Sequence, residues 1–148
     1  MTAGKIGDDG FEPRAMFAEP KTFAAVGSLP APRPGVAASN AQYRAAVLQH
    51  VAARAVREQL RHRGTNQKDF FAKLSHIRGL SVGRVGRLLR GEQLATLEDI
   101  ALWFEHLPEG LDRFSSYVAN WDKTTKDMIQ RQRQELREEL EREREQGR

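Results

Sequence analysis

The chain of 148 residues contains no cysteine, so neither a disulfide framework nor a thiolate metal site can form. Long apolar runs are also missing: a membrane span needs about 20 consecutive apolar residues, and no run here comes near that length. The sequence does not open with a charged segment followed by an apolar stretch, which is the pattern of a signal peptide. We therefore expect a soluble cytoplasmic protein with no membrane partner.

Proline is scarce beyond the first 40 residues, which hold five of the six prolines. The stretch "GSLPAPRPGVAAS" alternates Pro, Ala and Gly, and such a sequence cannot sustain helical or ladder hydrogen bonds. We predict a disordered Pro/Gly/Ala-rich arm at residues 1–39, which serves as a tether or docks through its apolar fragments "AMFAEP" and "FAAV".

No stretch has the alternation of a half-buried strand, whereas apolar residues recur at helical spacing from about Ser39. The pattern predicts an all-α fold: a compact bundle of about five helices at 40–121, followed by a charged C-terminal helix at 122–148. The first helix should end at Gly64. Its expected core residues are Tyr43, Val47, Leu48, Val51, Ala55, Val56 and Leu60, and those of later helices are Leu97, Ile100, Ala101, Phe104, Leu111, Phe114, Val118 and Trp121.

Three polar residues stand where helices of this bundle should begin. Asn66, Ser81 and Thr96 each precede a helical pattern and are residue types that cap helix N-termini. Asp69 and Asp99 follow two of them by three residues, which is capping-box spacing. The three caps set the phase of the helices that follow.

The modest net charge of +4 is unevenly distributed. Residues 57–91 contain nine basic and two acidic side chains, a net charge of +7. Such a concentration of positive charge suits a polyanionic partner, although a solvated basic surface would look the same. Arginine outnumbers lysine 18 to 6, which favours bidentate contacts.

The stretch "GLSVGRVGRLLRG" at 79–91 allows three interpretations: a hydrolase nucleophile elbow at Ser81, a phosphate-binding loop, or a capped basic helix. An elbow needs a buried strand before its serine, and the preceding "KLSHIR" is basic. The glycine spacing also differs from both phosphate-loop patterns. We therefore favour the helix, with Val85 and Leu88 facing the core, and expect no enzymatic activity.

The four histidines lack metal-ligand spacing, so we expect neither a metal nor a cofactor.

Residues from about 57 to 105 resemble the phage-repressor-like helix-turn-helix family, the XRE or Cro/C1 type. "RGTNQKDFFAKL" at 63–74 follows the family pattern R-G-x-S-Q-x-x-x-A-x-x-L, and matches to later family positions continue through Gly79-Leu80-Ser81 and Thr96-Leu97. Two departures stand out. The chain inserts residues 75–78, Ser75 to Arg78, between its two helices, and it places Gly83 and Gly86 inside the second.

The resemblance implies a role for the second helix in the DNA major groove. Gln67 should contact phosphate from the start of the first helix. The base-reading residues would be Val82, Gly83, Arg84 and Arg87, and further phosphate contacts would come from Lys68, Lys73, Arg78 and Arg90.

The implied function is sequence-specific binding of double-stranded DNA by a transcriptional regulator, as a homodimer on a palindromic operator. Two alternatives remain: a non-specific architectural DNA-binding protein, and an antitoxin or adaptor whose arm or C-terminal helix binds a protein.

Candidate dimer surfaces are the first helix, the segment around Phe114, Tyr117 and Trp121, and the terminal helix. In the terminal helix Ile129, Leu136 and Leu140 fit a heptad seam that also contains Arg133 and Glu143, so we expect it to be solitary or weakly paired.

Overall fold

The computed structural model describes residues 11–25 and 29–147. These residues form five α-helices and no strand, apart from one isolated bridge between Phe17 and Pro32. The predicted all-α class, with about five helices, is confirmed. The helices are α2 (Ala41–His62), α3 (Gln67–Ala72), α4 (Val82–Leu89), α5 (Leu97–His106) and α6 (Glu109–Gln146), preceded by the 3-10 helices η1 (Pro13–Met16) and η2 (Pro20–Thr22).

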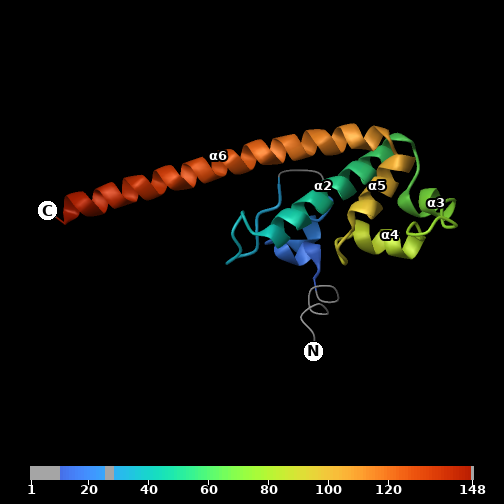
Figure 1. The fold of residues 1–148 in the computed structure, drawn as a ribbon, viewed down its shortest axis with the longest axis horizontal. Coiled ribbons are helices and arrows are strands. Elements are labelled where there is room, and N and C mark those ends of the chain that lie inside the picture. Colours follow the sequence, from blue (N-terminus) through green and yellow to red (C-terminus); the bar gives the residue numbers. More distant parts are fainter. Residues whose placement is uncertain (1–10, 26–28, 148) are drawn as a thin grey trace, which may run out of the picture.

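Helix α2 lies inside the body of the molecule, and α6 packs along it before running far beyond the other elements (Figure 1). Helices α3 and α4 lie at the end of the body away from the free end of α6. At 1.5 Å per residue, the 38 residues of α6 span about 57 Å. Residues 111–146 contain neither Gly nor Pro, so nothing interrupts the helix. The expected boundary between residues 121 and 122 falls inside this single helix.

Small residues on α2 allow close packing from several sides. Ala46, Ala52 and Ala53 are completely buried, as are the larger side chains Trp103 and Phe71 from neighbouring helices. The apolar stripe predicted for α2 is buried except for Leu48, which is 37% exposed.

Helix α5 is rotated relative to the expectation. Leu97, predicted to face the core, is 87% exposed, and Ala101 is exposed as well. Phe104 is buried and Ile100 packs against the core, as predicted, but the inner face also carries Asp99, Trp103 and Leu107, at spacings of four residues. The rotation follows from Asp99, whose side chain turns inward to its partners instead of remaining at the surface. Leu111 of α6, also predicted to face the core, is 50% exposed.

The N-terminal arm differs most from its prediction. Residues 1–10 lie outside the described part, but disorder is the wrong expectation for residues 11–25. Phe17 and Phe23 are 1% and 5% exposed, and their rings stack at 5.8 Å. Phe17 also meets the ring of Tyr43 on α2 edge-on at 6.0 Å. The aromatic side chains bury enough apolar surface to order a segment in which prolines exclude regular helix.

His50 of α2 fixes the arm to the body. Its Nδ1 accepts a hydrogen bond of 2.7 Å from the backbone N–H of Ala24, and its ring lies edge-on to Phe17 and Phe23. Burial lowers the pKa of His50 to about 4, with further lowering from the positive charges of Arg54 and Arg57. The imidazole is therefore neutral at physiological pH, which leaves Nδ1 free to accept the hydrogen bond.

Glu58 joins α2 to α6. Its carboxylate accepts hydrogen bonds from Arg54 at 3.0 Å, from Arg113 at 3.4 Å and from the hydroxyl of Tyr117. Burial alone would raise the pKa of Glu58, but the hydrogen bonds from Tyr117 and Arg54 outweigh burial, and its pKa is lowered. The guanidinium of Arg54 also lies 4.1 Å from the centre of the Tyr117 ring. The start of the long helix is therefore held on α2 by charge as well as by apolar contact.

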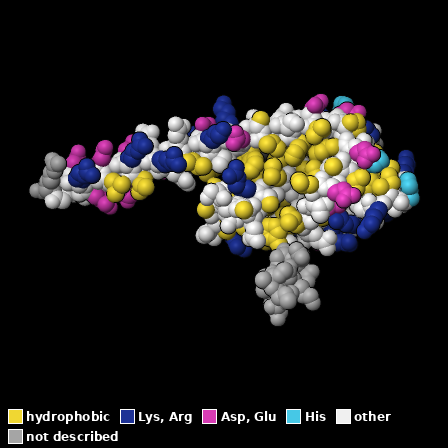
Figure 2. All heavy atoms as spheres, viewed as in Figure 1, with side chains coloured by type: hydrophobic (Ala, Val, Ile, Leu, Met, Phe, Trp, Pro, Cys, Tyr) yellow, Lys and Arg dark blue, Asp and Glu magenta, His cyan; other side chains and the backbone are white. Residues whose placement is uncertain are grey.

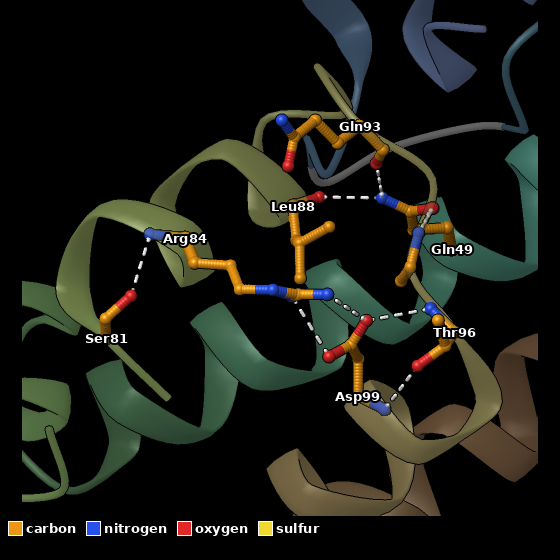
Figure 3. A network of polar contacts seen from close by, with 8 residues as sticks. Gln49, Ser81, Arg84, Leu88, Gln93, Thr96 and Asp99 are labelled. Atoms are coloured by element: carbon orange, nitrogen blue, oxygen red, sulfur yellow. Dashed lines mark hydrogen bonds and ion pairs between the residues drawn. The ribbon is translucent and has the colours of Figure 1, made fainter. Parts of the chain in front are cut away.

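Gln49 of α2 connects three backbone groups around the end of α4. Its Nε2 donates to the carbonyl oxygens of Leu88 and Gln93, both at 2.8 Å, and its Oε1 accepts from the N–H of Ala95 at 2.8 Å (Figure 3). Gln49 is 1% exposed, so the whole amide is used inside the protein. This one side chain fixes the C-terminal end of α4 and the loop that follows it.

The pKa of His50 predicts an acid-sensitive arm. The unfolded chain protonates this histidine near pH 6.5, whereas the folded protein keeps it neutral down to about pH 4. Its contribution to stability is complete above pH 6.5 and is lost as the pH falls to about 4, a loss of about 3 kcal/mol. Between pH 7 and 4, we expect the free energy of unfolding, measured with urea, to fall more steeply for wild type than for His50→Gln. The glutamine still accepts a hydrogen bond but does not titrate. The exposed His62→Gln is the control; equal slopes for wild type and His50→Gln would contradict the assignment.

Replacing Gln49 with leucine should destabilise the whole domain. Leucine keeps the volume but leaves the carbonyls of Leu88 and Gln93 and the N–H of Ala95 without their partner, at about 1 kcal/mol or more for each group. We expect a loss of about 3 kcal/mol in the free energy of unfolding, measured by urea denaturation. Gln42→Leu, at an exposed position of the same helix, should change stability by less than about 0.5 kcal/mol. Similar effects of the two substitutions would contradict the role of Gln49.

Candidate nucleic-acid interface

The caps that position α3 and α4 are at the predicted residues. Oδ1 of Asn66 accepts a hydrogen bond of 2.8 Å from the N–H of Asp69 at the start of α3. Oγ of Ser81 accepts one of 3.4 Å from the N–H of Arg84 at the start of α4. Thr96 and Asp99 form a complete capping box on α5. Ser81 is thus a helix cap at the end of a loop, with no strand before it.

The insertion between α3 and α4 does not extend either helix. The N–H of Ile77 bonds to the carbonyl of Leu74 at 2.9 Å, and the N–H of Leu80 bonds to the carbonyl of Ile77 at 3.1 Å, so the segment is a series of tight turns. Gly79 has a φ of +92°, a conformation that favours glycine. Leu80 is completely buried and fixes the connection to the core just before α4 begins.

Helix α4 exposes one stripe and buries the other. Val85, Leu88 and Leu89 are completely buried, whereas Gly83 and Arg87 are exposed. Val82, predicted to contact bases, is half-buried and packs against the core.

Side chains from α3 and from the end of α4 cross the stripe at Gly86. A Cβ placed on this glycine would lie 3.1 Å from Nη1 of Arg90 and 3.5 Å from Nε2 of Gln67. One placed on Gly83 would lie 3.5 Å from Nη1 of Arg87, so that guanidinium lies back over the first turn of α4. The two glycines therefore make room for polar side chains along the exposed stripe.

Arg57 of α2 belongs to this group, although it was not among the predicted site residues. Its guanidinium is half-buried, and its pKa is lowered first by burial and then by the positive charge of Arg90. Arg90 is itself partly neutralised by Glu92, with Nε and Oε2 2.5 Å apart. Two neighbouring guanidinium groups favour an anion between or above them. In the sequence Arg57 was one of nine bases, and only the packing of α2 against α4 shows that it adjoins Arg90.

Arg84 differs from the other predicted base readers. Its guanidinium is turned toward α5, where Nη1 and Nη2 lie 3.1 Å from the two carboxylate oxygens of Asp99 (Figure 3). Asp99 is 5% exposed and also accepts a hydrogen bond of 2.8 Å from the N–H of Thr96. We therefore assign Arg84 to the contact between α4 and α5 and not to the exposed stripe.

The remaining predicted phosphate contacts are exposed. Lys68 and Lys73 lie on and just after α3, and Arg78 lies in the turns before α4. Figure 2 shows Lys and Arg side chains gathered at the end of the body where Figure 1 places α3 and α4. We give the name α4 surface to the set Arg57, Gln67, Gly83, Gly86, Arg87 and Arg90. Gly83, Arg87 and Arg90 are exposed, Arg57 and Gln67 are half-buried, and Gly86 is buried beneath the side chains of Gln67 and Arg90.

The α4 surface offers charge and hydrogen-bond donors but no site for a metal ion. In the part of the chain that the structure describes, no three His, Asp or Glu side chains are placed to hold a metal. Within the same residues, no helix has both the length and the apolar character needed to cross a bilayer.

Comparison of the chain with protein-family models, with curated proteins and with solved structures finds no match in any of the three.

Proposed function

We propose that the protein binds double-stranded DNA through the α4 surface and regulates transcription in the cytoplasm, as a homodimer on a palindromic operator. The observation that carries this proposal is the exposed stripe of α4, which presents Gly83, Arg87 and Arg90 to solvent beside the half-buried Arg57 and Gln67. The major groove, about 12 Å wide, admits an α-helix, and the eight residues of α4 would bring these arginines to the bases and phosphates.

Arg87 is the base reader in this proposal. It is exposed in the last turn of α4, and arginine bonds bidentately to O6 and N7 of guanine. Arg57, Arg90 and Gln67 surround the stripe and would bind phosphates, which fixes the register of the helix without reading sequence. The resemblance to the phage-repressor-like family supports the assignment of Gln67 to phosphate, since this residue holds the position of the family's phosphate-contacting glutamine.

A non-specific architectural DNA-binding protein is the second candidate. Gly83 and Gly86 supply no side chains for reading bases, and Arg84 is engaged with Asp99. Discrimination would then rest on Arg87 alone. The two candidates differ in whether a particular DNA sequence is preferred.

Selection from a random duplex library separates these candidates. We expect wild type to enrich a palindrome containing guanine, and Arg87→Ala to lose the preference at that base by about 10-fold or more, because one bidentate pair is removed. Arg131→Ala, on the exposed part of α6, is the matched control and should select the same sequence as wild type. Binding without enrichment would favour the architectural protein. Failure of wild type to retain any duplex would reject both candidates and favour a protein partner.

Arg57 gives an independent test of phosphate binding. We expect Arg57→Gln to weaken binding to all duplexes alike and to reduce the slope of log affinity against log salt by about 1, because one phosphate contact is lost. The same change should leave the Tm of the free protein unchanged or raise it, because the substitution removes a half-buried charge next to Arg90. Fluorescence anisotropy from 50 to 300 mM salt and thermal unfolding measure the two effects. Unaltered affinity, or a large fall in Tm, would contradict the assignment.

A further inference from the structure

Two of the three dimer surfaces that the sequence suggested are largely occupied by contacts within the chain. Most of α2 is buried in the core, and Trp121 on α6 is 8% exposed because it packs within the same chain. Tyr117 is likewise engaged, through its hydroxyl, with Glu58. The remaining candidate is the last part of α6, in which every residue from 130 to 147 is exposed.

This protruding part of α6 carries two leucines without cover from the chain. Leu136 and Leu140 are 56% and 54% exposed and stand one turn apart. Figure 2 shows hydrophobic side chains on the protruding helix, apart from those of the body. Ile129, nearer the body, is half-buried and lines a groove together with arm residues between 32 and 39. Apolar cover from the arm therefore ends just before the two leucines.

The leucines belong to a stripe that also contains one residue of each charge. Arg133 precedes Leu136 by three residues, and Glu143 follows Leu140 by three. Spacings of three, four and three residues place all four on one face of the helix. We call Arg133, Leu136, Leu140 and Glu143 the α6 seam.

We propose that the α6 seam pairs with the same seam of a second copy of this chain, with the two helices antiparallel. The charges of the seam are placed symmetrically about the two leucines. When Leu136 faces Leu140 of the second copy in antiparallel orientation, Arg133 faces Glu143 of that copy, and Glu143 faces Arg133. A parallel pair would place arginine against arginine and glutamate against glutamate, which is unfavourable for both copies.

Residues beside the seam weaken this antiparallel pairing but do not change the preferred orientation of the two helices. Arg137 and Glu139 flank the leucines, and in the antiparallel pair each would approach its own counterpart. A parallel pair would instead bring Glu139 near Arg144. These flanking side chains are exposed and screened by solvent, whereas the seam residues lie between the helices, where charge pairing counts for more. The result is a weak dimer with a defined orientation.

Charge exchange on the seam tests the proposal in the full chain without DNA, so its outcome is independent of the proposed DNA binding. Sedimentation equilibrium at 50 mM salt and protein concentrations up to several hundred micromolar should show a dimer for wild type. Arg133→Glu and Glu143→Arg, each alone, should weaken the dimer about 10-fold, because each puts like charges in two facing positions. The double variant Arg133→Glu with Glu143→Arg should restore the wild-type constant, since antiparallel facing again pairs opposite charges.

Two further variants complete the test. Leu136→Ala with Leu140→Ala should abolish the dimer, and Arg131→Glu, on the side of the helix opposite the seam, should leave it unchanged. All these positions are exposed, and circular dichroism verifies that the variants fold. A wild-type chain that stays monomeric at every concentration overturns the proposal. A dimer whose affinity does not respond to the seam substitutions also overturns it. The same holds if the double variant dimerises no more tightly than the single variants, which is the result expected of parallel helices.

Discussion

The buried carboxylate of Asp99 determines how the end of the molecule that carries α3 and α4 is built. It caps α5 through the N–H of Thr96 and pairs with the guanidinium of Arg84 on α4, so one side chain connects two helices. A carboxylate that is 5% exposed needs such partners, because an unpaired buried charge is costly. Turning Asp99 inward rotates α5, which brings Trp103 into the core and sends Leu97 to the surface.

The same ion pair distinguishes the two arginines of α4, because it engages one inside the fold and leaves the other at the surface. Arg84 is occupied by Asp99, whereas Arg87, one turn further along, is exposed. Gln49 secures the other end of the helix by binding the carbonyl of Leu88. Helix α4 is thus held at both ends by buried polar groups, which is a rigid way to present a short helix with two glycines in it.

The features predicted correctly from the sequence are local ones. The caps at Asn66, Ser81 and Thr96 depend on side chains bonding to backbone three residues away, so the local sequence contains all of the chemistry. The stop of α2 before Gly64 was also predicted correctly, because its positive φ is a local requirement for glycine. Helical periodicity established the all-α class, and the caps established where α3, α4 and α5 begin.

The features that the sequence did not reveal depend on contacts between distant residues. The inward turn of Asp99 requires Arg84, 15 positions earlier, and the order of the arm requires His50, 26 positions after Ala24. In the sequence, Gln49 is a polar residue that interrupts the apolar stripe of α2. Its role becomes visible only from its three hydrogen bonds to the backbone of residues 88, 93 and 95. Arg57 was visible only as part of a basic segment, since its relation to Arg90 arises from the packing of α2.

The length of α6 would set the distance between the two bodies of the dimer. Helix α6 begins beside the end of the body that carries α3 and α4 (Figure 1). In an antiparallel pair centred between Leu136 and Leu140, the two helix starts would lie about 90 Å apart at 1.5 Å per residue. That separation corresponds to roughly two and a half turns of B-DNA, at about 34 Å per turn. Two copies joined in this way would contact half-sites of one palindromic operator that lie about two and a half turns apart.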